Sequence, residues 1–206
     1  MSRPRVVLAT RNAGKLAELH RILAGVPGLD VDLETLDGYP GLGEIPETGA
    51  TFAENALHKA YVVARHTGLP AVADDSGLAV DALNGMPGVL SARWSGRHGD
   101  DAANLALVLA QMAEVPDERR GATFVCAAAA VVPGVGERVV EGRLAGVLTR
   151  EPRGEQGFGY DPVFVPLGAD RTTAEMGPAE KDAVSHRGIA FRRLADPLAE
   201  LLRRQT

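Results

Sequence analysis

The sequence contains a single cysteine, Cys126, among 206 residues. One cysteine excludes an internal disulfide framework and a cysteine-based metal cluster. Its apolar surroundings in TFVCAAAAVV indicate a buried, unreactive thiol. No apolar run approaches the ~20 residues of a membrane-spanning helix, and the short run at 6–9 is too brief for a signal peptide. We therefore expect a cytoplasmic protein without a membrane partner.

A basic surface suited to nucleic acid is also missing. The formal net charge is -5, and the arginine pairs at 192–193 and 203–204 are typical of a solvated helix face. We expect no nucleic-acid partner, although a local cationic pocket or a metal ion would still let an acidic protein bind a small anion. Lysine is scarce too, with Lys15, Lys59 and Lys181 the only three among 22 lysines and arginines. Either coding bias left them there, or these positions need a compact ammonium.

The apolar patterning predicts an α/β chain, and 45% hydrophobic content supplies a core. Strands are expected at 6–9, near 31–36, at 71–73, 123–132 and 138–147, and after the Gly loop near 160. Helices are expected at 15–23, 51–67, 101–112 and from 185 to the end, with a restart at 196–197. The stretch PGVGE joins two of the strands as a hairpin. The mixture of βα units and a hairpin indicates a mixed sheet with flanking helices.

The stretch LATRNAGKLAEL runs from a predicted strand through a small polar loop into a predicted helix. A helix N-terminus with small residues and Lys15 beside it forms an anion site. The loop is no Walker A motif, because Ala9 replaces the first glycine and Leu16 lacks the metal-binding hydroxyl. On its own the loop is a weak signal, since Gly-Lys pairs also arise by chance.

The pair Asp74–Asp75 follows the strand expected at 71–73. Because adjacent strand residues face opposite sides, the two carboxylates should not clamp one ion together. One of them at a strand end is well placed to hold Mg²⁺, and Glu47 is a possible second carboxylate. The alternative is simple turn chemistry, since Asp-Ser-Gly is a favourable turn sequence.

The helix expected at 51–67 has clear end signals. Thr51 and Glu54 form a capping-box pattern, and Gly68 supplies the stop. Asn55 and Lys59 continue from Thr51 at helical spacing, and the simplest interpretation of this polar stripe is an exposed face.

Two further stretches, GFGYDPVF and EKDAVSHRG, carry groups that suit a planar ring. Phe158 can stack on it, and hydrogen-bond donors and acceptors come from Asp161, Lys181, His186 and Arg187. Each has an ordinary alternative, in the core, on the surface or at a helix start. Taken together, a phosphate loop, a metal carboxylate and a ring site describe a nucleotide site.

These motifs in this order resemble the inosine triphosphate pyrophosphatase family, also called dITP/XTP pyrophosphatases. The similar stretches are T-x-N-x-x-K at 10–15, TFAENALHKA, ADDSGL, PGVLSARWSG, GFGYDPVF and EKDAVSHRG, spanning Val6 to about Leu202. The resemblance implies an elongated mixed β-sheet with flanking helices, forming one domain over 1–206 with two lobes around a central cleft. It also implies a homodimer.

The implied reaction is Mg²⁺-dependent hydrolysis of ITP, dITP or XTP to the monophosphate and pyrophosphate. By motif match, Asp75 is the general base and a metal ligand, and Glu47 is a second metal ligand. The phosphates would be held by Thr10, Arg11, Asn12, Ala13, Gly14, Lys15, Lys59 and Ser76. The base would be bound by Phe158, Gly159, Tyr160, Asp161, Lys181, His186 and Arg187. The sequence departs from the family at Pro46, where many relatives are acidic, and at Tyr160, where some have Trp.

Two other functions are alternatives to this one. A Maf-like pyrophosphatase for pyrimidine or modified nucleotides fits the SHR and FGYD motifs poorly. A regulatory module that binds nucleotides without turnover would not need Asp75, Lys15 and Lys59 intact. The alternation of side chains along a strand does not determine which of Asp74 and Asp75 takes a proton.

Overall fold

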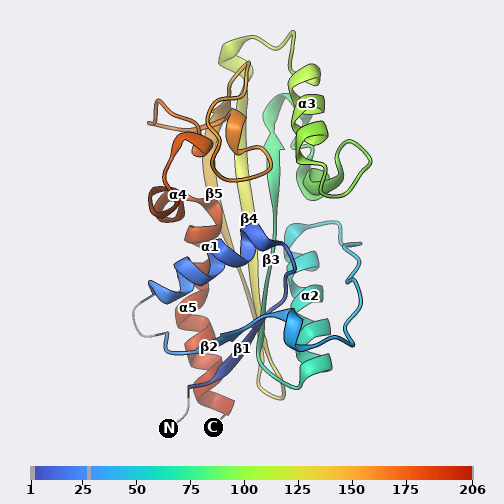
Figure 1. Ribbon diagram of the computed structural model, residues 1–206, viewed down its shortest axis with the longest axis vertical. Helices are drawn as coiled ribbons and strands as arrows, with labels where there is room; N and C mark the ends of the chain where they lie inside the picture. Colours follow the sequence, from blue (N-terminus) through green and yellow to red (C-terminus); the bar gives the residue numbers. More distant parts are fainter. Residues whose placement is uncertain (1–2, 27–28, 206) are drawn as a thin grey trace. The chain divides into compact units, whose positions relative to one another are not determined.

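The computed structural model describes residues 3–26 and 29–205, so two residues of the connection between the first helix and the strand near 31–36 lie outside it. The chain divides into two compact units, and Figure 1 shows the helices and strands that they contain. Unit 1 takes the described residues within Met1–Asp75, Cys126–Gly142 and Arg187–Thr206. Unit 2 takes Ser76–Val125 and Arg143–His186. The predicted cleft between two lobes stays a prediction.

Within the described residues, six strands form one mixed sheet in the order β2-β1-β3-β4-β5-β6. Strand β1 pairs in parallel with β2 and β3, whereas β6 pairs antiparallel with β5. Strands β3, β4 and β5 each contribute residues to both units. The strands are β1 (Arg5–Leu8), β2 (Asp32–Glu34), β3 (Ala71–Val80), β4 (Gly121–Val132), β5 (Gly136–Leu148) and β6 (Phe164–Pro166). The predicted α/β class with a mixed sheet and flanking helices is confirmed.

The helices begin where the sequence supplies caps. Asn12 caps α1, Asp100 caps α3, and Thr51 caps α2 by accepting from Glu54 N at 3.1 Å. The predicted capping box forms only in part, because the Glu54 carboxylate accepts from Ala50 N at 2.7 Å instead. The helices are α1 (Ala13–Ala24), α2 (Phe52–Thr67), α3 (Asp101–Gln111), α4 (Pro178–Val184) and α5 (His186–Gln205).

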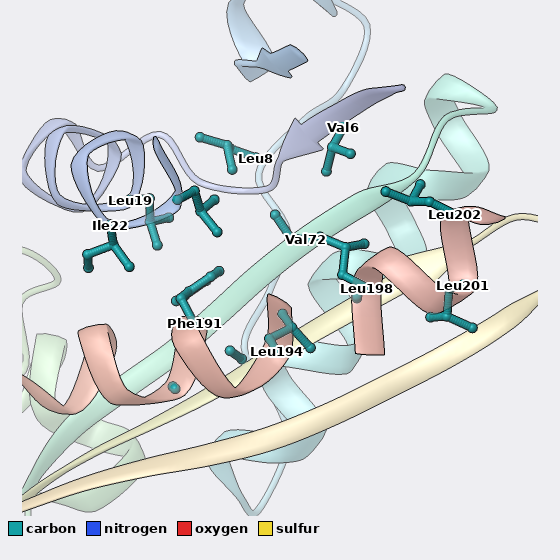
Figure 2. Packing of buried hydrophobic residues seen from close by; sticks show 14 of the residues in the cluster. Val6, Leu8, Leu19, Ile22, Val72, Phe191, Leu194, Leu198, Leu201 and Leu202 are labelled. Atoms are coloured by element: carbon teal, nitrogen blue, oxygen red, sulfur yellow. The ribbon is translucent and has the colours of Figure 1, made fainter. Parts of the chain in front are cut away.

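Within unit 1, helices α1 and α5 cover one face of the sheet (Figure 2). Val6, Leu8 and Val72 point to this face and pack with Leu19 of α1 and Phe191 of α5. Alternate residues of β4 complete the cluster with small side chains, which let the helices approach the sheet closely. They are Cys126, Ala128 and Ala130.

Helix α2 covers the opposite face of the same strands. Val7, Ala71 and Ala73 pack with its apolar side chains, among them Ala60 and Val63. The strict alternation between two buried faces is typical of strands that are covered on both sides. It follows that two adjacent residues further along β3 must meet different helices.

Unit 2 has its own apolar cluster, formed by α3 and by the parts of β3, β4 and β5 that belong to unit 2. Leu78 and Val108 are fully buried in it. Phe124 and Phe164 contact each other with ring centroids 4.4 Å apart and planes tilted by 49°, a favourable aromatic geometry. This cluster includes Tyr160, one of the predicted base-binding residues.

Cys126 lies fully buried in the α1 and α5 cluster of unit 1. Burial among apolar groups raises the pKa of its thiol far above the usual range, because a thiolate cannot be solvated there. The predicted burial of the thiol is confirmed, and the raised pKa agrees with the low reactivity that we expect.

The structure corrects three expectations. The turn expected after 71–73 is wrong, because β3 continues through Asp74 and Asp75 to Val80 and pairs with β4. Sheet pairing therefore overrides the turn propensity of Asp-Ser-Gly. The restart expected at 196–197 is also wrong, because α5 is one helix that contains Pro197. Helix α4 was not predicted. Among the described residues, no helix combines the length and apolar character needed to cross a bilayer.

The α5 packing gives a stability prediction. Leu194 is 1% exposed in the cluster that α1 and α5 form on one face of the sheet. Leu194→Ala should therefore lower the free energy of unfolding by about 2–5 kcal/mol, because burial is lost and a cavity is left. Urea denaturation measures the change. The matched control is Leu167→Ala, since that leucine is 69% exposed and its truncation should cost less than about 0.5 kcal/mol. Equal losses in the two variants would contradict the packing described.

Candidate active site

The segment from Thr10 to Lys15 forms the turn that leads from β1 into α1. Asn12 Oδ1 accepts a hydrogen bond from Lys15 N at 3.0 Å, and Thr10 Oγ1 accepts one from Asn12 N at 3.2 Å. The Arg11 guanidinium donates to Leu42 O at 2.5 Å, which ties the turn to a neighbouring loop. Ala13 and Gly14 begin the helix. The predicted anion loop therefore lies at a helix N-terminus, where backbone N–H groups attract negative charge.

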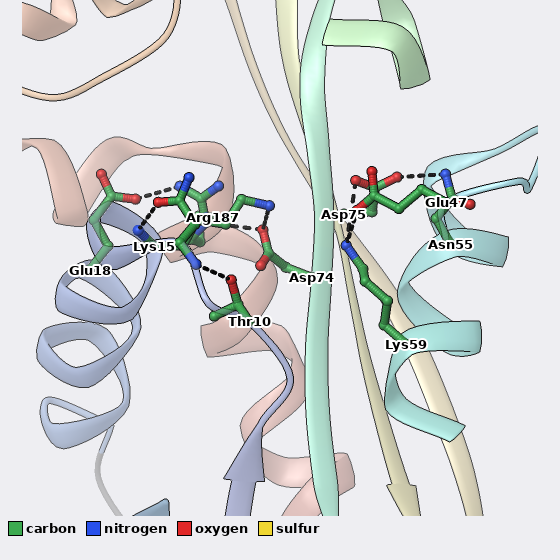
Figure 3. Close-up of polar contacts among 10 residues, drawn as sticks. Thr10, Lys15, Glu18, Glu47, Asn55, Lys59, Asp74, Asp75 and Arg187 are labelled. Atoms are coloured by element: carbon green, nitrogen blue, oxygen red, sulfur yellow. Dashed lines mark hydrogen bonds and ion pairs between the residues drawn. The ribbon is translucent and has the colours of Figure 1, made fainter. Parts of the chain in front are cut away.

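Four charged residues, of which all but Lys15 are buried, form what we call the Asp74 cluster (Figure 3): Lys15, Glu18, Asp74 and Arg187. Asp74 Oδ2 lies 3.0 Å from Lys15 Nζ and 3.2 Å from Arg187 Nε. Arg187 also binds the Glu18 carboxylate of α1. The cluster thus joins α1, β3 and α5 with two positive and two negative charges.

The neighbouring cations determine the ionisation of Asp74. Burial by itself would raise the pKa of this carboxyl, but the charges of Lys15, Arg187 and Lys59 outweigh it and hold the pKa far below its usual range. Asp74 is therefore a fixed anion. It holds the ammonium of Lys15 beside the anion loop.

A second set of polar side chains lies on the other face of β3, and we call it the Asp75 cluster (Figure 3). It comprises the charged residues Glu47, Lys59 and Asp75 and the neutral amide of Asn55. Lys59 Nζ is 2.5 Å from Glu47 Oε1 and 3.8 Å from Asp75 Oδ1. Asn55 Nδ2 donates to Asp75 Oδ2 at 2.9 Å. The prediction that the two aspartates face opposite sides is confirmed, whereas the exposed stripe predicted for α2 is wrong at Asn55 and Lys59, which are 1% and 8% exposed.

The surroundings of Asp75 shift its pKa in the opposite direction to that of Asp74. Burial raises the pKa of Asp75, and although Lys59 opposes this, the nearby Glu47 adds to it. Burial acts to lower the pKa of Lys59, but Asp75, Asp74 and Glu47 outweigh it and raise that pKa. Lys59 therefore stays an ammonium, while Asp75 is a carboxylate whose proton affinity is increased, as a general base near neutral pH requires.

The Asp75 cluster can hold a divalent cation only when the phosphate oxygens of a bound molecule complete the coordination shell. The carboxylates of Glu47 and Asp75 already share one cation, the Lys59 ammonium, so their oxygens converge on one region. No group of three or more His, Cys, Asp or Glu residues suited to a metal exists in the described part of the chain. Two carboxylates completed by phosphate oxygens are a normal arrangement for Mg²⁺, and the donor set here matches it.

Unit 2 holds a separate set, which we call the Phe158 group: Phe158, Asp161, Thr173 and Lys181. The Asp161 carboxylate accepts from Phe158 N at 2.8 Å, from Thr173 Oγ1 at 2.8 Å and from Lys181 Nζ at 2.5 Å. Lys181 Nζ also lies 5.0 Å from the centre of the Phe158 ring, within the range of a cation–π contact. Asp161 therefore fixes the ring and the ammonium relative to each other.

The Gly-rich loop needs its glycines to bring these groups together. Gly157 and Gly159 have φ values of 77° and 63°, a left-handed region that favours glycine. A side chain at Gly157 would also collide with the Asp161 carboxylate. Gly159 N donates to Asp101 Oδ2 at 2.9 Å, and Tyr160 is anchored by its hydroxyl, which donates to a backbone carbonyl at 2.9 Å.

The remaining predicted residues have defined places. His186 is buried in unit 2 and stacks on Phe124 with ring centroids 4.7 Å apart. Ser76 is half-buried on β3, directly after Asp75. Arg187 is buried in the Asp74 cluster, and its predicted role in binding the base stays a prediction.

Sequence reasoning missed several residues that hold these groups in place. Glu18 lies three residues after Lys15, so helical spacing alone could have placed it beside a site lysine. The spacing did place Asn55 beside Lys59, but on a face that was expected to be exposed. Asp101 was expected only at a helix start, and no sequence pattern pointed to Thr173.

The family model described as the Ham1 family matches residues 6–197 of the chain. The chain belongs to the Ham1 family.

Ham1 relatives with high identity extend over nearly the whole chain. A protein of Nocardia farcinica named dITP/XTP pyrophosphatase is 65% identical over 98% of each chain. One of the same name from Streptomyces coelicolor is 60% identical over 96% of this chain and 98% of that protein.

Solved Ham1 structures agree with the fold. The crystal structure of a nucleoside-triphosphatase, or dITP/XTP pyrophosphatase, from Mycobacterium abscessus has a TM-score of 0.74 and 62% identity, covering 92% of this chain and 98% of that one. A HAM1 protein from Coxiella burnetii has a TM-score of 0.83 and 41% identity, covering 96% of this chain and 99% of that one.

The Asp74 cluster of this Ham1 protein gives a second prediction. Arg187→Met should lower the free energy of unfolding by about 3–5 kcal/mol, because it leaves Asp74 and Glu18 buried with too little positive charge. Urea denaturation at neutral pH measures this. Arg204→Met is the control, since Arg204 forms an exposed pair with Glu200 on α5 and such pairs contribute about 0–1 kcal/mol. A loss at Arg187 no larger than that at Arg204 would contradict the buried network.

Proposed function

We propose that this protein is a Mg²⁺-dependent nucleoside triphosphate pyrophosphatase that hydrolyses ITP, dITP and XTP to the monophosphate and pyrophosphate. The observation that carries the proposal is the Asp75 cluster, in which a carboxylate of raised pKa lies beside a lysine and a second carboxylate. Ham1 relatives at 60–65% identity that are named dITP/XTP pyrophosphatase support it. We place the activity in a cytoplasmic homodimer that cleanses the nucleotide pool.

Glu47 and Asp75 are the residues that would hold Mg²⁺, with substrate phosphates completing its shell. When bound, the ion neutralises phosphate charge and acidifies or orients the attacking water. The fit rests on two carboxylates that already converge on one ammonium.

The chain's own residues supply the remaining chemistry. Asp75 accepts the proton of the water that attacks the α-phosphorus, which the raised proton affinity of its carboxylate favours. Lys15 and Lys59 place ammonium charges where negative charge collects on the leaving pyrophosphate. The turn formed by Thr10, Arg11, Asn12, Ala13 and Gly14 adds backbone N–H groups at the start of α1, and Ser76 adds a hydroxyl.

We assign base recognition to the Phe158 group together with His186, Arg187, Gly159 and Tyr160. The Phe158 ring stacks on the purine, and Lys181, His186 or Arg187 donates to its 6-oxo group. Gly159 and Tyr160 shape the loop. Adenine carries an amino donor at that position, so it would leave a buried donor unpaired, and such sites reject the wrong base strongly. Asp161 already binds Lys181 at 2.5 Å, and so holds the ammonium in place for this contact.

The first test of the function is pyrophosphate release from ITP, XTP, dITP, GTP, ATP and dTTP, with Mg²⁺ and with EDTA. We expect fast release from ITP, dITP and XTP only, abolished by EDTA and reduced at least 100-fold in Asp75→Asn, because loss of a general base typically costs 10²–10⁴-fold. Release from dTTP alone would indicate a Maf-like enzyme. Binding without release from any nucleotide would indicate a regulatory module.

The second test concerns the base. Lys181→Ala should raise KM for ITP by about 10-fold or more, because it removes a charge-assisted hydrogen bond worth ~1.5–3 kcal/mol. The Mg²⁺ concentration that gives half-maximal activity should stay the same. Steady-state kinetics at several Mg²⁺ concentrations separate the two effects, and an unchanged KM for ITP would remove Lys181 from the base site.

A further inference from the structure

Asn55 is a buried polar side chain in the middle of α2 that no motif argument assigned to the site. It is 1% exposed and lies one helical turn before Lys59. A buried amide is stable only when its donor and acceptor groups are satisfied, so its partners indicate what it does.

Both ends of the amide are used, and Figure 3 shows the contact with Asp75. Asn55 Oδ1 accepts a hydrogen bond from Gly49 N at 2.7 Å, and Asn55 Nδ2 donates to Asp75 Oδ2 at 2.9 Å. Since a backbone N–H can only donate and an ionised carboxylate can only accept, these partners fix the orientation of the amide. The Asn55 side chain thus joins β3 to the loop that precedes α2, at a point two residues after Glu47.

Gly49 allows this close approach. A Cβ added at this position would lie 2.8 Å from both Asn55 Oδ1 and Glu54 Cβ, closer than real side chains come. Because Gly49 has no side chain, its backbone N–H can reach the Asn55 amide. This hydrogen bond ties the loop that contains Glu47 to α2.

We propose that Asn55 is a positioning residue that sets the placement of the Glu47 and Asp75 carboxylates relative to each other. It binds Oδ2 of Asp75, which leaves Oδ1 on the side of Lys59 and Glu47. Lys59 also contacts both carboxylates, but as a flexible cation it competes with a metal ion for them. A neutral amide keeps its contacts whether or not a cation is bound. The inference rests on the proposed function, because it assigns Asn55 to the metal carboxylates.

The test compares Asn55→Leu with Asn104→Leu. Both asparagines are 1% exposed on helices, and Asn104 Oδ1 likewise accepts from a backbone N–H, that of Ser95, at 2.7 Å. Three quantities are measured: the unfolding midpoint, kcat and KM for ITP, and Mg²⁺ affinity by calorimetry on enzyme saturated with a non-hydrolysable ITP analogue.

We expect both variants to lose stability. Only Asn55→Leu should lose about 10–100-fold in kcat and in Mg²⁺ affinity, the usual effect of removing a group that orients metal ligands, with KM for ITP changed less than 3-fold. Asn104→Leu should keep kcat within 2-fold. Wild-type kcat and Mg²⁺ affinity in Asn55→Leu, or the same loss of kcat in both variants, would overturn the proposal.

Asn55→Asp is the second variant in case Asn55→Leu does not fold. The aspartate can still accept from Gly49 N but cannot donate to Asp75, so kcat should fall, and full activity would overturn the proposal. The assay also separates the two claims. If the wild type releases no pyrophosphate from ITP, the proposed function fails. In that case the calorimetry tests the positioning role of Asn55 separately. Equal Mg²⁺ affinity in the wild type and Asn55→Leu would overturn that role.

Discussion

The alternation of side chains along β3 is the constraint on which the site depends. Because neighbouring strand residues point to opposite faces, Asp74 meets Lys15 of α1 and Arg187 of α5, whereas Asp75 meets Lys59 and Asn55 of α2 (Figure 3). The same alternation divides the apolar residues of β1 and β3 between two clusters. The packing that builds the core thus also distributes the charges of the site.

The two aspartates differ in pKa because their surroundings differ in charge. Asp74 has two close cations and stays ionised, so it can hold the ammonium of Lys15 in place. Asp75 shares one lysine with Glu47 and is buried, which raises its pKa. Titratable groups with pKa values driven apart in this way divide fixed electrostatic roles from proton transfer. In the proposed reaction, Asp74 supports binding while Asp75 accepts the proton.

Local patterns in the sequence predicted much of this arrangement. The turn ending at Lys15, the cap at Thr51 and the opposed aspartates depend on short-range rules, and each is present. The continuation of β3 past Asp75 was not predictable, because sheet pairing overrides a local turn preference. The burial of Asn55 and Lys59 was missed for a related reason. A polar stripe on a helix is exposed unless another element supplies charged partners, and those partners come from β3 and a distant loop.

The most direct test is to measure the free energy of unfolding of Asp74→Asn and Asp75→Asn side by side at neutral pH. Asp74→Asn should lose about 3–5 kcal/mol, because it leaves Lys15 and Arg187 without their shared carboxylate. Asp75→Asn should change the stability by less than about 1 kcal/mol, since burial already disfavours the charge that it removes. Equal losses, or a larger loss in Asp75→Asn, would contradict the division of roles between the two faces of β3.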